Sequence, residues 1–235
     1  MQRYNAINMR KSQAYKLSFT LVFLLMEAAV LSLGYWQYGR MHEKRDARTE
    51  IEAQLAESQT VQLSQAQPWQ RVDIIGTLDN SRSIALAHQQ MGALMGWRIV
   101  TPMALDDWRE VLIDRGWMRF PENRIAPNFE QFVVTEPINI SGVVRPFPSL
   151  YGRGTATGAS DRVLNGFNPD LIDKTNPRLP FYIQATTPTH ADLLARLSPL
   201  PDGARHQQYM LTWWGMALVL LFGFVGWIRQ IFKKK

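Results

Sequence analysis

The uncharged stretch at residues 209–228 constrains the fold of this chain more than any other feature of its sequence. At about 1.5 Å per residue, a helix of this length spans roughly 30 Å, which is the thickness of the hydrocarbon core of a bilayer. Trp213 and Trp214 lie near one end of the stretch and Trp227 lies near the other, where aromatic rings favour the membrane–water interface. Residues 209–228 are therefore expected to span a membrane.

A second apolar stretch, residues 17–36, is interrupted only by Glu27. A cleaved signal peptide with its apolar core at residues 17–26 is the alternative, but the apolar character resumes beyond the expected cleavage site and favours a retained helix. An ionised carboxylate in mid-bilayer costs about 2.5–3.5 kcal/mol, so Glu27 is expected to be neutral or to face a partner. A functional role and a protonated carboxyl bonded to Thr212 or Ser32 both remain open.

The net charge of +6 comes from the two ends of the chain. Residues 1–16 and 229–235 each carry four basic residues and no acidic one, whereas residues 37–208 hold 18 Lys and Arg against 19 Asp and Glu. Basic flanks mark the cytoplasmic side of membrane helices, so both termini are expected in the cytoplasm. A nucleic-acid partner is not expected, because the middle of the chain is nearly neutral.

The predicted layout follows from these two helices and their flanks. In a bacterium the chain would cross the inner membrane twice and hold its main domain in the periplasm; in a mitochondrion that domain would lie in the intermembrane space. The five parts are a basic tail at 1–16, a membrane helix at 17–36, a domain at 37–208, a membrane helix at 209–228 and a basic tail at 229–235.

The composition excludes several classes of site. The chain has no cysteine, which rules out disulfides, thiolate copper and zinc sites and the attachment of a c-type haem. Its four histidines show no metal-site spacing, and it has no G-x-S-x-G, P-loop, H-E-x-x-H or G-x-G-x-x-G motif. No catalytic residue is therefore assigned, and an enzyme is not expected.

The domain between the membrane helices is expected to be rich in β-strands. Residues 37–58 contain many helix formers, so the first helix should continue to near Ser58. Beyond Trp69, short strands alternate with turns, which predicts an α+β fold with an antiparallel sheet or a small open barrel. Residues 146–178 are expected to form a mobile loop, and Thr187 and Pro188 to open a short helix ending at Leu197. The predicted strands are 71–78, 83–88, 97–103, 110–117, 138–145 and, more weakly, 181–185.

His206 is a candidate ligand because it stands just outside the second apolar stretch. A neutral imidazole is a common axial ligand of haem iron, and the rim of a membrane suits a cofactor with a hydrophobic ring. The alternative is an interfacial histidine, with nearby arginines that extend to the membrane surface. The residues that could form aromatic walls and bind propionates are Tyr209, Trp213 and Trp214, and Arg40 and Arg205.

The sequence Arg115-Gly116-Trp117 ends a predicted strand, beside Asp114. Arg and Trp together on a surface are frequent in protein–protein hot spots, which would make these three residues an interaction site. A buried Trp with an Asp–Arg pair that closes a hairpin is the alternative, and both interpretations remain open.

Four segments of the chain resemble the surfeit locus protein one family. Leu33-Gly34-Tyr35-Trp36-Gln37, followed by Arg40, resembles the structural L-G-x-W-Q signature of that family. Residues 96–102 (GWRIVTP), 111–117 (VLIDRGW) and 206–213 (HQQYMLTW) resemble three further segments in the same order. The resemblance covers about residues 17–228, and it departs from the family at Asp114, where Asn is usual, and at Gln207, where Leu is usual.

The resemblance implies a function, because members of this family are assembly factors for cytochrome c oxidase. Bacterial members are described as binding haem a, and the matching ligand is His206, with Arg40, Tyr209 and Trp213 as further haem-binding residues. Haem a would come from the haem a synthase and pass to oxidase subunit I. The alternative is a scaffold that carries no haem and holds subunit I through the region of Arg115, Gly116 and Trp117.

Overall fold

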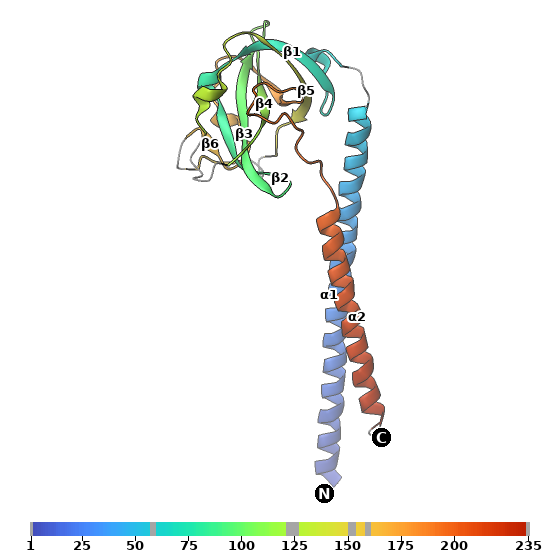
Figure 1. Ribbon diagram of the computed structural model, residues 1–235. Coiled ribbons are helices and arrows are strands. Elements are labelled where there is room, and N and C mark those ends of the chain that lie inside the picture. The colour runs from blue at the N-terminus through green and yellow to red at the C-terminus, as the bar shows by residue number, and fades with distance from the viewer. Residues whose placement is uncertain (1, 57–59, 121–126, 150–153, 158–160, 234–235) are drawn as a thin grey trace. The chain divides into compact units, whose positions relative to one another are not determined.

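A computed structural model describes residues 2–56, 60–120, 127–149, 154–157 and 161–233. The chain divides into two compact units. A helical unit comprises Met1–Glu50 and Leu200–Lys235, and a β unit comprises Ile51–Pro199. Figure 1 shows the two long helices and the curved strands, which are described separately below.

The helical unit is a pair of antiparallel helices, α1 (Gln2–Ala56) and α2 (Ala204–Lys233). No proline occurs before Pro68, so nothing in the sequence interrupts the 55 residues of α1. The rings of Phe23 and Phe224 stack with centroids 4.0 Å apart, and those of Phe19 and Trp227 are 4.3 Å apart. The N-terminal end of α1 and the C-terminal end of α2 consequently lie at the same end of the pair (Figure 1).

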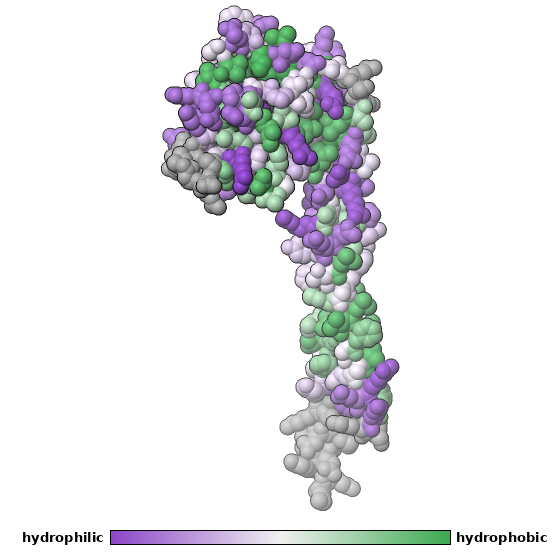
Figure 2. All heavy atoms as spheres, viewed as in Figure 1, coloured by the Kyte–Doolittle hydropathy of each residue, from purple (hydrophilic) through white to green (hydrophobic). Residues whose placement is uncertain are grey.

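Both helices are long and apolar enough to cross a membrane. Their apolar side chains mostly face outward, as at Leu25, Leu218 and Phe222. In Figure 2 these residues form a hydrophobic band on the helix pair, with polar residues on either side of it. A soluble protein rarely exposes so large an apolar surface, which is the surface that a bilayer would cover.

Glu27 lies in the apolar part of α1 without the expected partner. Its Oε2 atom is buried and has no hydrogen-bond partner among the residues that the structure describes. Thr212, one of the two predicted partners, donates its hydroxyl to the carbonyl of Gln208 at 2.9 Å.

The β unit contains a closed five-stranded barrel. Its strands follow the order β1-β5-β7-β4-β3, and β3 returns to β1 through the pairs Thr77–Ala104 and Leu78–Met103. β2 and β6 extend the sheet beyond β3. The bounds are β1 Arg71–Leu78, β2 Ile84–Met91, β3 Leu94–Ala104, β4 Glu110–Arg119, β5 Ile138–Pro146, β6 Val163–Leu164 and β7 Arg178–Ala185.

Buried and exposed residues alternate strictly in β1, where every second residue from Val72 to Leu78 is buried and faces the core of the barrel. These side chains pack with others from β3, β4, β5 and β7 in one cluster, including Ile113, Ile140 and Ile183. Nearly all of β4 is buried on both faces, because Ile113 packs in this cluster and Leu112 packs in a second cluster with residues of β2 and β3.

The structure confirms the predicted α+β fold with a β-rich domain between two long helices and refines it in two respects. The barrel is closed rather than open, and two pairings of the sheet, β4–β7 within the barrel and β2–β6 outside it, are parallel rather than antiparallel. The strand predicted most weakly, at 181–185, is part of β7, which joins β4 to β5 in the ring.

The predictions for two connecting segments have different outcomes. Most of the described residues at 146–178 lie in a loop, as expected, and this loop contains β6 and a short 3₁₀ helix, Pro169–Leu171. Residues 150–153 and 158–160 lie outside the described part. The helix predicted from Thr187 to Leu197 is wrong, because it does not form. Its residues pair with the sheet instead: the Thr187 amide donates to the Ser141 carbonyl, and Leu194 exchanges two backbone hydrogen bonds with Trp117.

Candidate functional site

His206 lies in the first turn of α2, where it faces α1. The helix begins at Ala204, whose amide donates to the Asp202 carboxylate at 3.1 Å, and the Gln207 amide donates to the Gly203 carbonyl at 2.9 Å. These two bonds satisfy amides that a helix N-terminus would otherwise leave unpaired. The position of His206 is therefore fixed at the start of the helix.

Gln37 of α1 fixes the orientation of the His206 ring. The side chain of Gln37 is 8% exposed, and its Oε1 lies 2.7 Å from His206 Nδ1. An amide oxygen can only accept, so in a neutral ring this contact places the proton on Nδ1 and leaves the lone pair of Nε2 available. No group among the described residues bonds to Nε2. Metal-binding histidines commonly have this arrangement, in which one ring nitrogen donates to a protein oxygen and the other binds the metal.

Two further contacts set the register between the helices around this histidine. Arg45 Nη2 donates to Gln207 Oε1 at 2.8 Å on the polar side of the His206–Gln37 pair. On the apolar side Gly34 lies against the indole of Trp214, so closely that a Cβ at position 34 would overlap the ring. Gly34 therefore allows the two helices to approach closely, whereas Gly215 has no atom within 4 Å of its would-be Cβ.

The predicted aromatic residues are arranged around the same helix faces. Tyr209 and Trp213 follow His206 by three and seven residues, which places them along one side of α2. Tyr209 is exposed and Trp213 is half-buried. The structure also brings together three rings that the sequence did not single out as a group: Tyr38 lies 4.3 Å from His42 and 6.2 Å from Trp214.

Arg40 is one turn from Gln37 on α1 and forms an ion pair with Glu43. Both side chains are largely exposed, and exposed pairs contribute little, about 0–1 kcal/mol. The guanidinium of Arg40 is thus able to exchange Glu43 for another carboxylate. Trp36 of the L-G-x-W-Q signature is exposed. It does not face α2 as Gly34 and Gln37 of the same signature do.

Arg115 is not on the surface of the β unit. Its side chain is 0% exposed and donates to the Phe132 carbonyl at 2.7 Å, to Thr189 Oγ1 at 3.2 Å and to Asn80 Oδ1 at 3.4 Å. Burial lowers the pKa of Arg115 to about 10. A protein–protein hot spot needs an accessible arginine, so this side chain acts inside the fold, where it ties three segments together.

Gly116 and Trp117 are buried beside Arg115. Gly116 has a φ of +136°, a conformation that favours glycine, and it lies against the Leu194 carbonyl. The ion pair expected at this hairpin does form, but Asp114 pairs with Arg98 at 2.6 Å rather than with Arg115. The buried alternative therefore describes Arg115, Gly116 and Trp117 better than a surface interaction site.

No group of three or more His, Asp or Glu side chains is suited to hold a metal ion in the described part of the chain. A metal at His206 would therefore need further ligands from a cofactor. Haem iron meets this condition, because the porphyrin supplies four ligands and leaves the axial positions to the protein.

Comparison with known proteins decides the family of this chain. Residues 24–218, which include both Gln37 and His206, match the SURF1 family. The chain belongs to the SURF1 family. It is 26% identical to the SURF1-like protein of Rickettsia felis over 228 residues, which cover 90% of this chain and 97% of that protein. It is 27% identical to the SURF1-like protein of Rickettsia conorii over 89% of this chain and 90% of the relative.

Family membership confirms the resemblance of the four sequence segments and implies a role in the assembly of cytochrome c oxidase. Together with the two apolar helices, it also identifies the chain as a membrane protein. The pairing of His206 with Gln37 could not be derived from either motif alone, because the two residues are 169 positions apart. Only the antiparallel packing of α1 and α2 brings them together.

Proposed function

We propose that this chain binds haem a through His206 and assists its insertion into subunit I of cytochrome c oxidase. The observation that carries the proposal is the imidazole of His206, held by Gln37 through Nδ1 and unpartnered at Nε2. The SURF1 family supports the pathway, and the chemistry of a single oriented imidazole supports the choice of a haem.

Each residue near His206 has a distinct role in this proposal. His206 Nε2 ligates the iron, and Gln37 positions the ring. Tyr209 and Trp213 contact the porphyrin face, and Arg40 exchanges its exposed partner Glu43 for a propionate. Haem a is a cargo here, since no bond in it is made or broken, so the chain acts as a carrier and chaperone rather than as an enzyme.

The cargo would come from the haem a synthase and pass to subunit I within the membrane. A single protein ligand suits such a transfer, because the acceptor has only one iron–histidine bond to replace. The proposed setting is the bacterial inner membrane, with both termini in the cytoplasm and residues 37–208 in the periplasm. His206 then stands at the periplasmic end of α2, where the apolar span begins.

The test is the pyridine haemochrome spectrum of the full chain, purified in detergent from cells that also produce haem a synthase. We expect near-stoichiometric haem a in the wild type and at least a tenfold loss in His206→Ala. Gln37→Leu should retain less haem than the wild type and bind it with an altered spectrum, since it removes the bond that orients the ring.

The matched control is His88→Asn, which replaces an exposed histidine of β2 that lies outside the helical unit. Asn is chosen because residue 88 has a positive φ, which Asn tolerates. If His206→Ala retained haem, His206 would not be the iron ligand. If the wild type contained no haem, the chain would not be a haem carrier, and the scaffold would be the remaining function.

A further inference from the structure

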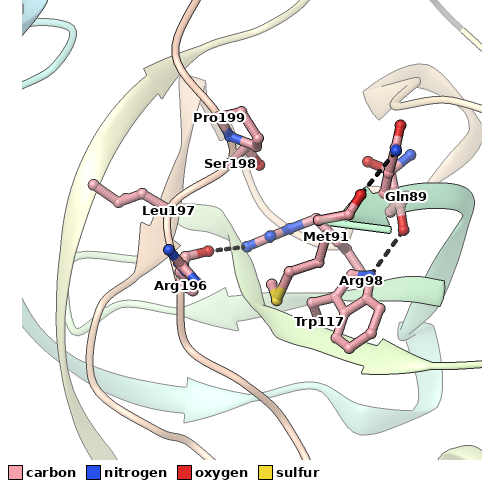
Figure 3. A pocket seen from close by; sticks show the side chains of 10 residues that line it. Gln89, Met91, Arg98, Trp117, Arg196, Leu197, Ser198 and Pro199 are labelled. Carbon is pink, nitrogen blue, oxygen red and sulfur yellow. Dashed lines mark hydrogen bonds between the residues drawn. The ribbon is translucent and has the colours of Figure 1, made fainter. Parts of the chain in front are cut away.

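A cavity of about 340 Å³ lies within the β unit and shares no residue with the site at His206. One wall is the end of β2 and the turn after it, residues 89–92, and the opposite wall is residues 196–199. Arg98 of β3 and Trp117 of β4 line it between these walls (Figure 3). Its volume is at the lower end of the range for small-molecule sites.

Hydrogen bonds hold both walls of the cavity in place. The Trp117 indole donates to the Gln89 carbonyl at 2.8 Å, which fixes the β2 wall. The Trp117 backbone exchanges bonds of 3.0 and 2.8 Å with Leu194, at the start of the segment that forms the other wall. Gln184 of β7 donates to Ser198 Oγ at 2.8 Å and accepts from the Ser198 amide at 3.2 Å. The cavity is therefore a formed site rather than a gap between mobile loops.

Arg98 gives the cavity its chemical character. Its side chain is only 5% exposed, with Nε bonded to Asp114 at 2.6 Å and Nη2 bonded to the Arg196 carbonyl at 3.0 Å. Nη1 has no partner among the described residues and is not closed off from solvent. Because Arg98 lines the cavity, this nitrogen is available to donate to an acceptor that binds there.

The rest of the lining also favours an acceptor with a negative charge. Arg196 adds a second cation at the exposed side, and no acidic residue lines the cavity in the described part of the chain. Ser198 accepts from Gln184 through its hydroxyl oxygen, which leaves the hydroxyl proton free to donate. Met91, Leu197 and the ring of Trp117 supply apolar surface beside these donors.

We propose that this cavity binds an organic carboxylate that carries a small apolar group. A guanidinium matches the planar geometry of a carboxylate, and charge-assisted bonds of this kind are roughly twice as strong as neutral ones. The apolar group lies against Trp117, Met91 and Leu197. A free organic acid and the C-terminal residue of a peptide both have this chemistry, so the experiment must distinguish them.

The first experiment titrates 3-phenylpropionate into the detergent-solubilised full chain and measures binding by calorimetry. Its neutral analogue, 3-phenylpropionamide, reports partition into the micelle. We expect saturable binding of the carboxylate that is at least tenfold tighter than that of the amide. Equal behaviour of acid and amide, both in this pair and in the peptide pair described below, would overturn the proposal.

Variants locate the binding in this cavity. Arg196→Gln and Ser198→Ala should each weaken the carboxylate at least fivefold, and both leave the buried Arg98–Asp114 pair intact. Arg98→Gln should abolish binding if it folds. Arg119→Gln, at an exposed arginine of β4 that does not line the cavity, is the matched control and should bind as the wild type does. Unchanged binding in both Arg196→Gln and Ser198→Ala would reject the site.

The second arm compares the dipeptide acetyl-Ala-Phe with its C-terminal amide. Binding of both 3-phenylpropionate and the dipeptide acid supports the carboxylate site with no preference for the source. Binding of the free acid alone identifies a small metabolite, and binding of the peptide alone identifies a chain terminus. Binding of neither acid refutes the proposal.

Discussion

The arginines of the β unit differ in how their buried charge is compensated. Arg98 pairs with Asp114. Arg82 and Arg178 both pair with Glu110, which is 0% exposed and accepts from them at 2.9 Å and 2.6 Å. Among the described residues Arg115 has no carboxylate partner; it donates to three neutral oxygens, which compensate a charge less fully. This difference explains why burial lowers the pKa of Arg115 to about 10.

Arg115 should therefore leave a signature in the dependence of stability on pH. Its pKa is about 10 in the folded state and well above 10 in the unfolded state, so above pH 10 the unfolded chain holds more protons at this site. The free energy of unfolding contributed by Arg115 consequently rises with pH, by about 1.4 kcal/mol per pH unit at most. Between pH 9 and 11 the wild type should gain about 1 kcal/mol relative to Arg115→Met, measured by denaturant titration with tryptophan fluorescence.

The comparison with Arg115→Met removes the effect of other groups. Tyr182, whose pKa burial raises, makes the opposite contribution over the same range, but it is common to both proteins. Arg119→Met, at an exposed site, is the control for loss of an arginine. A difference between wild type and Arg115→Met that stays constant from pH 9 to 11 would contradict this assignment.

The elements that were predicted well are those whose pattern is local. The strand at 71–78 shows its alternation in the sequence. The first helix continues out of the apolar stretch as far as Ala56, and its expected end near Ser58 lies outside the described residues. The segment after Thr187 has good local signals for a helix, yet its backbone pairs with Ser141 and Trp117, because closing the sheet satisfies more backbone groups than an isolated turn does. Barrel closure, the two parallel pairings and the His206–Gln37 bond depend on contacts distant in sequence.

The helix pair offers a direct test of the packing at Gly34. Gly34→Ala would place a Cβ within the indole of Trp214, and overpacking of this kind typically costs about 1–3 kcal/mol. Gly39→Ala, five residues along the same helix, meets no atom within 4 Å and should be neutral or stabilising, since alanine favours the helix. We expect a lower thermal midpoint for Gly34→Ala than for Gly39→Ala in detergent. Equal midpoints would show that the close approach of the helices is not needed for stability.

The arrangement of the whole chain in the membrane follows from its charges and its two spans. Because α1 and α2 are antiparallel, the residues before the first apolar stretch and those after the second lie at the same end of the pair (Figure 1). Both flanks are basic, whereas the segment between the spans has nearly balanced charge, so the topology proposed above places the basic end in the cytoplasm. In that proposal residues 37–208, including the cavity at Arg98 and the imidazole of His206, lie on the periplasmic side.

Reporter fusions test this topology. Alkaline phosphatase is active only outside the cytoplasm, so a fusion after residue 120 should be active and a fusion after Lys235 inactive. Green fluorescent protein should give the reverse pattern, which excludes a failure of expression as the cause of low activity. If the Lys235 fusion were active with phosphatase and dark with the fluorescent protein, α2 would not end in the cytoplasm. His206 would then lie on the cytoplasmic side of the membrane, whereas the proposed delivery of haem requires it at the periplasmic end of the span.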